Sequence, residues 1–129
     1  MPGTTEVELV EVLQTFCAGF ANHDAHAVSR LFAHDSDLTV VTSEQPLLRG
    51  PEEMRAFLER YAAGSTTYSW NWDRHDVTVA GTVAWLLAEG TETATSDDGA
   101  EQHAYRMTMV FERRDDGWKI RHVHGSSPH

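Results

Sequence analysis

The hydrophobic pattern of the chain changes at Gly64, and this change constrains the fold more than any other feature. Before Gly64, apolar residues recur at the spacing of amphipathic helices, whereas after it they alternate with a strand-like period. The second half contains four such runs, at residues 67–79, 83–95, 101–114 and 118–126. The turns between them are too short for a crossover helix, so the runs are predicted to form an antiparallel meander.

The first half is predicted to contain three helices and a short strand. The first helix spans residues 5–22, and Asp24 is expected to cap a short second helix. A strand is expected at residues 38–42, after which Gly50-Pro51 begins a third helix that ends at Gly64. Helices followed by long strands indicate an α+β fold, in which a strongly curved antiparallel sheet wraps round the helices of a single domain, residues 1–129.

The charge of the chain excludes several classes of partner. Its formal net charge of −10 would repel phosphate backbones and anionic lipids, so neither nucleic acid nor a membrane surface is an expected partner. No apolar run approaches the ~20 residues of a membrane span, and the first residues lack the pattern of a secretory signal. Cys17 is the only cysteine, so no internal disulfide is possible. We therefore expect a cytoplasmic protein.

The run at residues 105–111 is apolar on both faces, although the chain has too few helices to cover both faces of a sheet. We therefore expect the outer face of the sheet to form a homodimer interface.

Three segments together resemble the SnoaL-like branch of the nuclear transport factor 2-like superfamily. They are FANHD at 20–24 with LFAHD at 31–35, LRGPEE at 48–53, and RRDDGWKIRHVHGS at 113–126. The last segment is also similar to the association domain of calcium/calmodulin-dependent kinase II. The resemblance implies a cone-shaped fold with an apolar pocket, but it implies no single reaction, because the superfamily includes ketosteroid isomerase, polyketide cyclases, dehydratases and non-catalytic modules.

The residues that ketosteroid isomerase requires are missing. When the pattern of ketosteroid isomerase is aligned with this chain at Asp24, the tyrosine of the isomerase falls on Phe16 and its carboxylate base falls on or beside Val40. Its second hydrogen-bond donor falls near residues 108–110. None of these side chains can move a proton as that enzyme requires, so steroid isomerisation is not expected.

His122 and His124 are the leading catalytic candidates, because imidazole titrates near neutral pH. Simple alternation places them on one strand face with Trp118, Ile120 and Ser126, where they are alternatively buried structural histidines. One bulge would reverse this assignment and present Arg121, Val123 and Gly125 instead. The resemblance matches Gly125 to a pocket-lining arginine of the kinase association domain.

Arg106 is the third catalytic candidate. It could bind an anionic group of a ligand, or it could form an ion pair with Glu89 or Glu92 on the neighbouring strand. His122 and His124 could also bind a metal with His103, but their spacing is not diagnostic, and neither a metal nor a cofactor is predicted.

The function predicted from the sequence is the binding of a small hydrophobic molecule, aromatic or polyketide-like, in an apolar pocket. A cyclase-, isomerase- or dehydratase-type enzyme is one form of this prediction, and a non-catalytic dimeric binding or assembly module is the alternative. The predicted pocket residues are Phe16, Phe20, Phe32, Val40, Phe57, Tyr61, Trp85, Thr108 and Ser126.

Overall fold

A six-stranded sheet in the order β2-β1-β6-β5-β4-β3 forms the frame of the molecule. The computed structural model describes residues 4–42 and 47–127. Its strands are β1 (Thr39–Val41), β2 (Leu48–Arg49), β3 (Thr67–Ala80), β4 (Val83–Ser96), β5 (Gly99–Arg114) and β6 (Gly117–Ser126). The four long strands pair in sequence order and antiparallel, which confirms the predicted meander. The short strand β1 adds to β6 in parallel.

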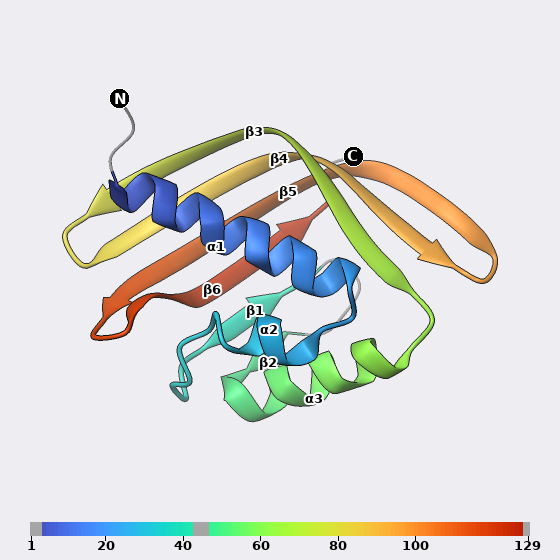
Figure 1. Ribbon diagram of the computed structural model, residues 1–129, viewed down its shortest axis with the longest axis horizontal. Coiled ribbons are helices and arrows are strands. Elements are labelled where there is room, and N and C mark those ends of the chain that lie inside the picture. Colours follow the sequence, from blue (N-terminus) through green and yellow to red (C-terminus); the bar gives the residue numbers. More distant parts are fainter. Residues whose placement is uncertain (1–3, 43–46, 128–129) are drawn as a thin grey trace.

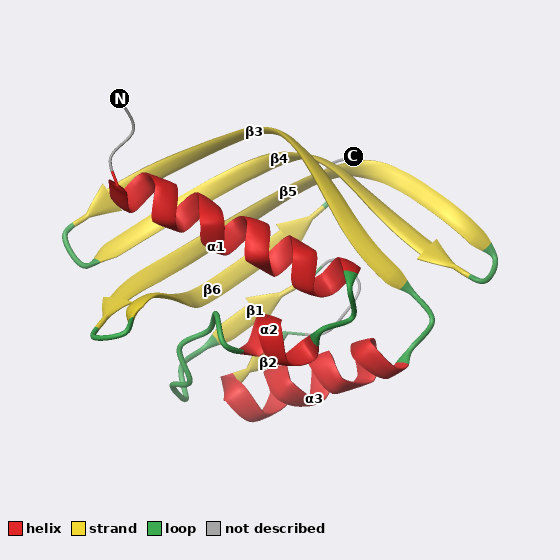
Figure 2. Cartoon of the chain, in the orientation of Figure 1, coloured by secondary structure: helices red, strands yellow, loops and turns green. Residues whose placement is uncertain are grey.

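Three helices pack against the concave side of this sheet, as Figures 1 and 2 show. They are α1 (Thr4–Ala21), α2 (Ala25–Ser29) and α3 (Gly50–Ala63). Asp24 caps α2 by accepting a hydrogen bond from the Ala27 amide at 3.1 Å, as predicted. Pro51 lies in the first turn of α3, where its missing amide hydrogen costs no helical bond. The α+β prediction, with a curved sheet round N-terminal helices, is therefore confirmed.

The sheet bends where β3 has a bulge between Trp72 and Arg74. Gly90 of β4 lies opposite this bulge, and a Cβ atom at Gly90 would come within 2.1 Å of the Asn71 carbonyl oxygen. Only glycine lets the two backbones approach this closely. The bend lets β3 curve along its length round the helices (Figure 1).

The two faces of β4 differ sharply in burial. Ala84, Leu86 and Ala88 point toward the helices and are fully buried. Trp85 and Leu87 point the other way and keep 43% and 36% of their surface exposed, because no described helix covers the outer face. No helix in the described part of the chain is long and apolar enough to cross a membrane.

Candidate functional site

A cavity of about 310 Å³ lies between the helices and the concave face of the sheet. α1 contributes Phe16 and Phe20, which are four positions apart and therefore share one helix face. The other predicted pocket residues that line it are Val40 from β1, with Phe57 and Tyr61 from α3. The structure thus brings five of the nine predicted pocket residues together. The remaining lining residues are Val41, Thr42, Met54, Arg60, Gly64, Ser65, Thr66, Tyr68, Trp70, Glu92, Tyr105, Met107, Val123 and Gly125.

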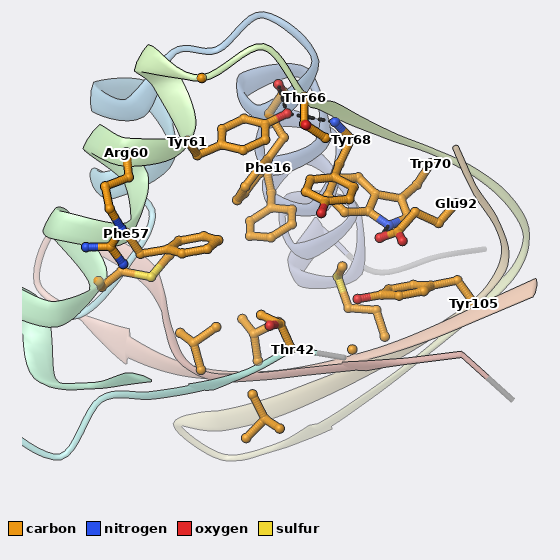
Figure 3. A pocket seen from close by; sticks show the side chains of 18 of the residues that line it. Phe16, Thr42, Phe57, Arg60, Tyr61, Thr66, Tyr68, Trp70, Glu92 and Tyr105 are labelled. Carbon is orange, nitrogen blue, oxygen red and sulfur yellow. Dashed lines mark hydrogen bonds between the residues drawn. The ribbon is translucent and has the colours of Figure 1, made fainter. Parts of the chain in front are cut away.

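Aromatic rings form much of the cavity wall (Figure 3). The ring centroids of Phe16 and Phe20 lie 4.9 Å apart, and Trp70 lies 5.8 Å and 5.5 Å from them. Tyr105 extends the wall from β5, with its ring centroid 6.3 Å from that of Trp70. These tilted and edge-on contacts are favourable for aromatic pairs and hold the rings in place.

Tyr61 joins three elements at one end of the cavity. Its hydroxyl donates to the Phe20 carbonyl at 2.8 Å and accepts from the Tyr68 amide at 2.7 Å, while its ring stacks on His23 at 4.7 Å. Burial raises the pKa of Tyr61, the negative charge of Glu92 raises it further, and the bond from Tyr68 offsets part of the rise. The phenol is therefore neutral at physiological pH, and its hydroxyl makes hydrogen bonds within the fold.

Glu92 is the buried carboxylate of the cavity wall, with 3% of its surface exposed. Cross-strand register places it opposite Trp70 of β3 and His103 of β5. Trp70 Nε1 donates to Glu92 Oε2 at 2.9 Å, and His103 Nε2 lies 2.8 Å from Glu92 Oε1. A buried carboxylate is costly unless such partners satisfy it. Trp70 lines the cavity beside Glu92, whereas His103 does not line it.

From the sequence, Glu92 is expected only as a possible partner of Arg106. A signal for its true position was nevertheless present, because Glu92 continues the alternating series of buried residues Ala84, Leu86 and Ala88 along β4. Arg106 instead pairs with Glu89 on the outer face, with Arg106 Nε 3.4 Å from Glu89 Oε2.

Gly125 leaves room for the phenol of Tyr105. A Cβ atom at Gly125 would lie 2.0 Å from Tyr105 Oη and 2.7 Å from its Cζ. The Tyr105 phenol therefore lies against the position that the sequence resemblance matches to an arginine in the kinase association domain.

A bulge in β6 decides between the two faces considered for His122 and His124. Val110 pairs with His122 but Phe111 pairs with Ile120, so Arg121 is the extra residue. Trp118 and Ile120 face the core, whereas beyond the bulge the inward positions belong to Val123 and Gly125.

The catalytic candidates consequently lie outside the cavity. His122, His124 and Arg106 are on the outer face of the sheet, and His122 Nδ1 lies 2.6 Å from Thr39 Oγ1 of β1. Burial lowers the pKa of His122, the nearby His124 lowers it further, and the contact with Thr39 partly offsets both effects.

Four predicted pocket residues also lie elsewhere. Trp85, Thr108 and Ser126 are on the outer face, because each alternates with an inward-facing neighbour. Phe32 is packed in the core with 2% of its surface exposed, and it does not line the cavity.

The three histidines considered together as metal ligands are separated by the sheet, since His103 faces inward and His122 and His124 face outward. Within residues 4–42 and 47–127, no group of three or more His, Cys, Asp or Glu side chains is arranged to hold a metal ion.

The chain belongs to the family of SnoaL-like domains, whose sequence profile matches residues 9–129. The matched segment therefore includes the elements that build the cavity, from the buried face of α1 to β6. A comparison with curated proteins finds no match.

Solved structures similar to this chain share the nuclear transport factor 2-like fold. A protein of that family from Streptomyces avermitilis, provisionally described as a dehydratase, is 19% identical over 99% of both chains, with a TM-score of 0.87. A protein from Novosphingobium aromaticivorans, provisionally described as an aromatic ring hydroxylase, is 18% identical over 100% of this chain and 92% of its own, with a TM-score of 0.87. A protein from Xanthomonas campestris, provisionally described as a calcium/calmodulin-dependent kinase II association domain, is 22% identical over 94% and 86%, with a TM-score of 0.77. At these identities the likeness establishes the fold alone.

Proposed function

We propose that the protein binds a small, mainly hydrophobic molecule with an aromatic or polyketide-like body. The observation that carries this proposal is the cavity of about 310 Å³, which has aromatic walls and, among the described residues that line it, one buried acid, Glu92. Concave, mostly apolar sites with a few fixed polar groups are typical of small-molecule binding. The rings would supply the contact area, and the carboxylate would orient the ligand.

A reaction of the cyclase, isomerase or dehydratase type would need a general acid or base in contact with the ligand. Glu92 is the carboxylate that lines the cavity, and the names given to the Streptomyces and Novosphingobium proteins are compatible with such chemistry. Ligand binding ranks above catalysis in this proposal, and steroid isomerisation is not part of it, because Phe16 and Val40 present only apolar groups to the cavity.

Thermal-shift screening with aromatic and polyketide-like compounds tests the proposal, since a ligand that binds only the native state raises Tm. For a compound that raises Tm, Phe57→Ala should weaken binding about tenfold by removing one wall of the cavity, a loss of roughly 1.4 kcal/mol. Val110→Ala, on the outer face, is the matched control and should leave Kd unchanged. The proposal fails if no compound binds, or if both substitutions affect Kd equally.

A non-catalytic dimeric module is the second candidate, and a separate observation favours it. Val83, Trp85 and Leu87 form an exposed apolar row on the outer face of β4, which we call the outer patch. Such a row is typical of an interaction surface, and it would serve assembly whether or not the cavity holds a ligand.

A further inference from the structure

Three of the described residues that line the cavity are exposed to water, and all of them lie at the C-terminal end of α3 or just beyond it. They are Arg60, Gly64 and Ser65, which we call the mouth of the cavity. The other described lining residues are buried or half-buried. A ligand in the cavity would therefore have one end near water at the mouth and the rest of its body enclosed.

Arg60 is the only Lys or Arg among the described residues that line the cavity. Figure 3 shows it at the edge of the cavity beside Phe57, whose ring points inward. Phe57 lies three positions before Arg60 and so shares its face of α3. The edge of the cavity thus combines an apolar ring, which can contact the enclosed part of a ligand, with a cation that faces water.

The guanidinium of Arg60 forms no ion pair and no hydrogen bond with any described residue. The positions three and four residues away on the same helix, where a partner would lie, hold Ala56, Phe57, Ala63 and Gly64. The charge of Arg60 is therefore available to a ligand at the mouth. A charged group of the ligand could also keep part of its hydration there, which makes binding less costly.

Three sources of negative charge could oppose an anion at the mouth, and each is limited. Glu92 lies at the other end of the cavity (Figure 3), where Trp70 and His103 bind it. The C-terminal end of α3 carries a partial charge of about half a unit, which is smaller than the full charge of Arg60. The net charge of −10 is screened beyond about 8 Å at physiological salt. Arg60 is thus the dominant charge at the mouth.

We propose that the ligand carries a carboxylate at one end of its aromatic or apolar body, and that Arg60 binds this carboxylate at the mouth. The planar guanidinium can form two parallel hydrogen bonds with a carboxylate. The body would extend inward past Phe57 toward Phe16 and Trp70. The inference rests on the proposed ligand-binding function and adds the charge class of the ligand. It does not depend on the charge of Glu92.

Isothermal titration calorimetry at neutral pH with three naphthalene probes tests this inference on the wild-type chain. Naphthylacetate carries a carboxylate, naphthylacetamide is its neutral counterpart of similar shape, and naphthylethylamine is cationic. We expect the acid to bind about fivefold more tightly than the amide, near the upper limit for an exposed ion pair, and the amine to bind most weakly. Raising the salt concentration to about 1 M should remove most of the preference for the acid, because the pair is exposed.

Three substitutions on α3 locate the source of the preference. Arg60→Gln removes the charge, so the preference for the acid over the amide should fall to about twofold or less, while Kd of the amide stays unchanged. Arg60→Lys keeps the charge but loses the planar fork, and it should retain part of the preference. Arg55→Gln is the matched control and should leave the preference intact, because Arg55 is also exposed on α3 but does not line the cavity.

The possible outcomes separate the inference from the function on which it rests. If the amide binds as tightly as the acid, or Arg60→Gln keeps the full preference, the inference is overturned and ligand binding stands. Equal losses in Arg60→Gln and Arg55→Gln would also overturn it, since the overall charge of α3 would then be the cause. If naphthylacetate does not bind while neutral compounds raise Tm in the thermal-shift screen, the inference again fails alone. If nothing binds in either experiment, both proposals fail together.

Discussion

At the scale of single residues, the position of the Tyr105 phenol depends on the missing side chain of Gly125. We expect Gly125→Ala to push the phenol aside and to destabilise the fold by about 1–3 kcal/mol, the usual effect of overpacking. Urea unfolding measures this loss, and Ser126→Ala, on the exposed neighbouring position, should change little. In a Tyr105→Leu background the cost of Gly125→Ala should shrink. An equal cost in both backgrounds would show that the two residues do not interact.

At the scale of elements, the burial of His122 on β6, where this strand pairs with β1, makes stability depend on pH. Its pKa is lowered in the folded state, mainly by burial, so the unfolded chain binds a proton more readily. Stability should therefore fall as the pH drops below about 6.5, the ordinary histidine value, and the loss should level off below the folded-state pKa. Urea midpoints at pH 7 and pH 5 measure the loss. It should be smaller in His122→Asn and unchanged in His26→Asn, an exposed position on α2. Equal losses in all three chains would remove His122 as the cause.

The three helices and the four long strands were predictable, because each carries its own periodicity and end signals, whereas the two-residue strand β2 was not. Asp24, Pro51 and Gly64 likewise mark helix ends by local chemistry. The parallel pairing of β1 with β6 was not predictable, since it joins Thr39 to His122, which are 83 positions apart in the chain.

Residues of the candidate site were predictable only where the pattern of a single helix or strand determines which way a side chain points. Phe16 and Phe20 follow from the buried stripe of α1 alone. The bulge at Arg121 arises from pairing between β5 and β6, so strict alternation assigned His122 to the wrong face. The role of Glu92 depends on cross-strand partners, Trp70 and His103, that no local pattern connects.

At the scale of the whole molecule, the outer patch of Val83, Trp85 and Leu87 lies on the side of the sheet that carries no described helix. Large apolar side chains exposed in a row on a sheet face are costly in water unless another surface covers them. A second copy of the chain would present the same patch, and the two patches would cover each other in an isologous twofold interface.

We therefore expect sedimentation to show a dimer at micromolar concentration, held together through the outer patch. Trp85→Glu places a charge in the centre of this patch and should give a folded monomer, because a buried unpaired carboxylate opposes association. Val79→Glu is the matched control: Val79 is 46% exposed, but it pairs with Ala84 and so shares the inward side of the sheet. It should leave the dimer intact, since its charge lies away from the interface. A monomeric wild-type chain, or equal dissociation by both variants, would contradict association through the outer patch.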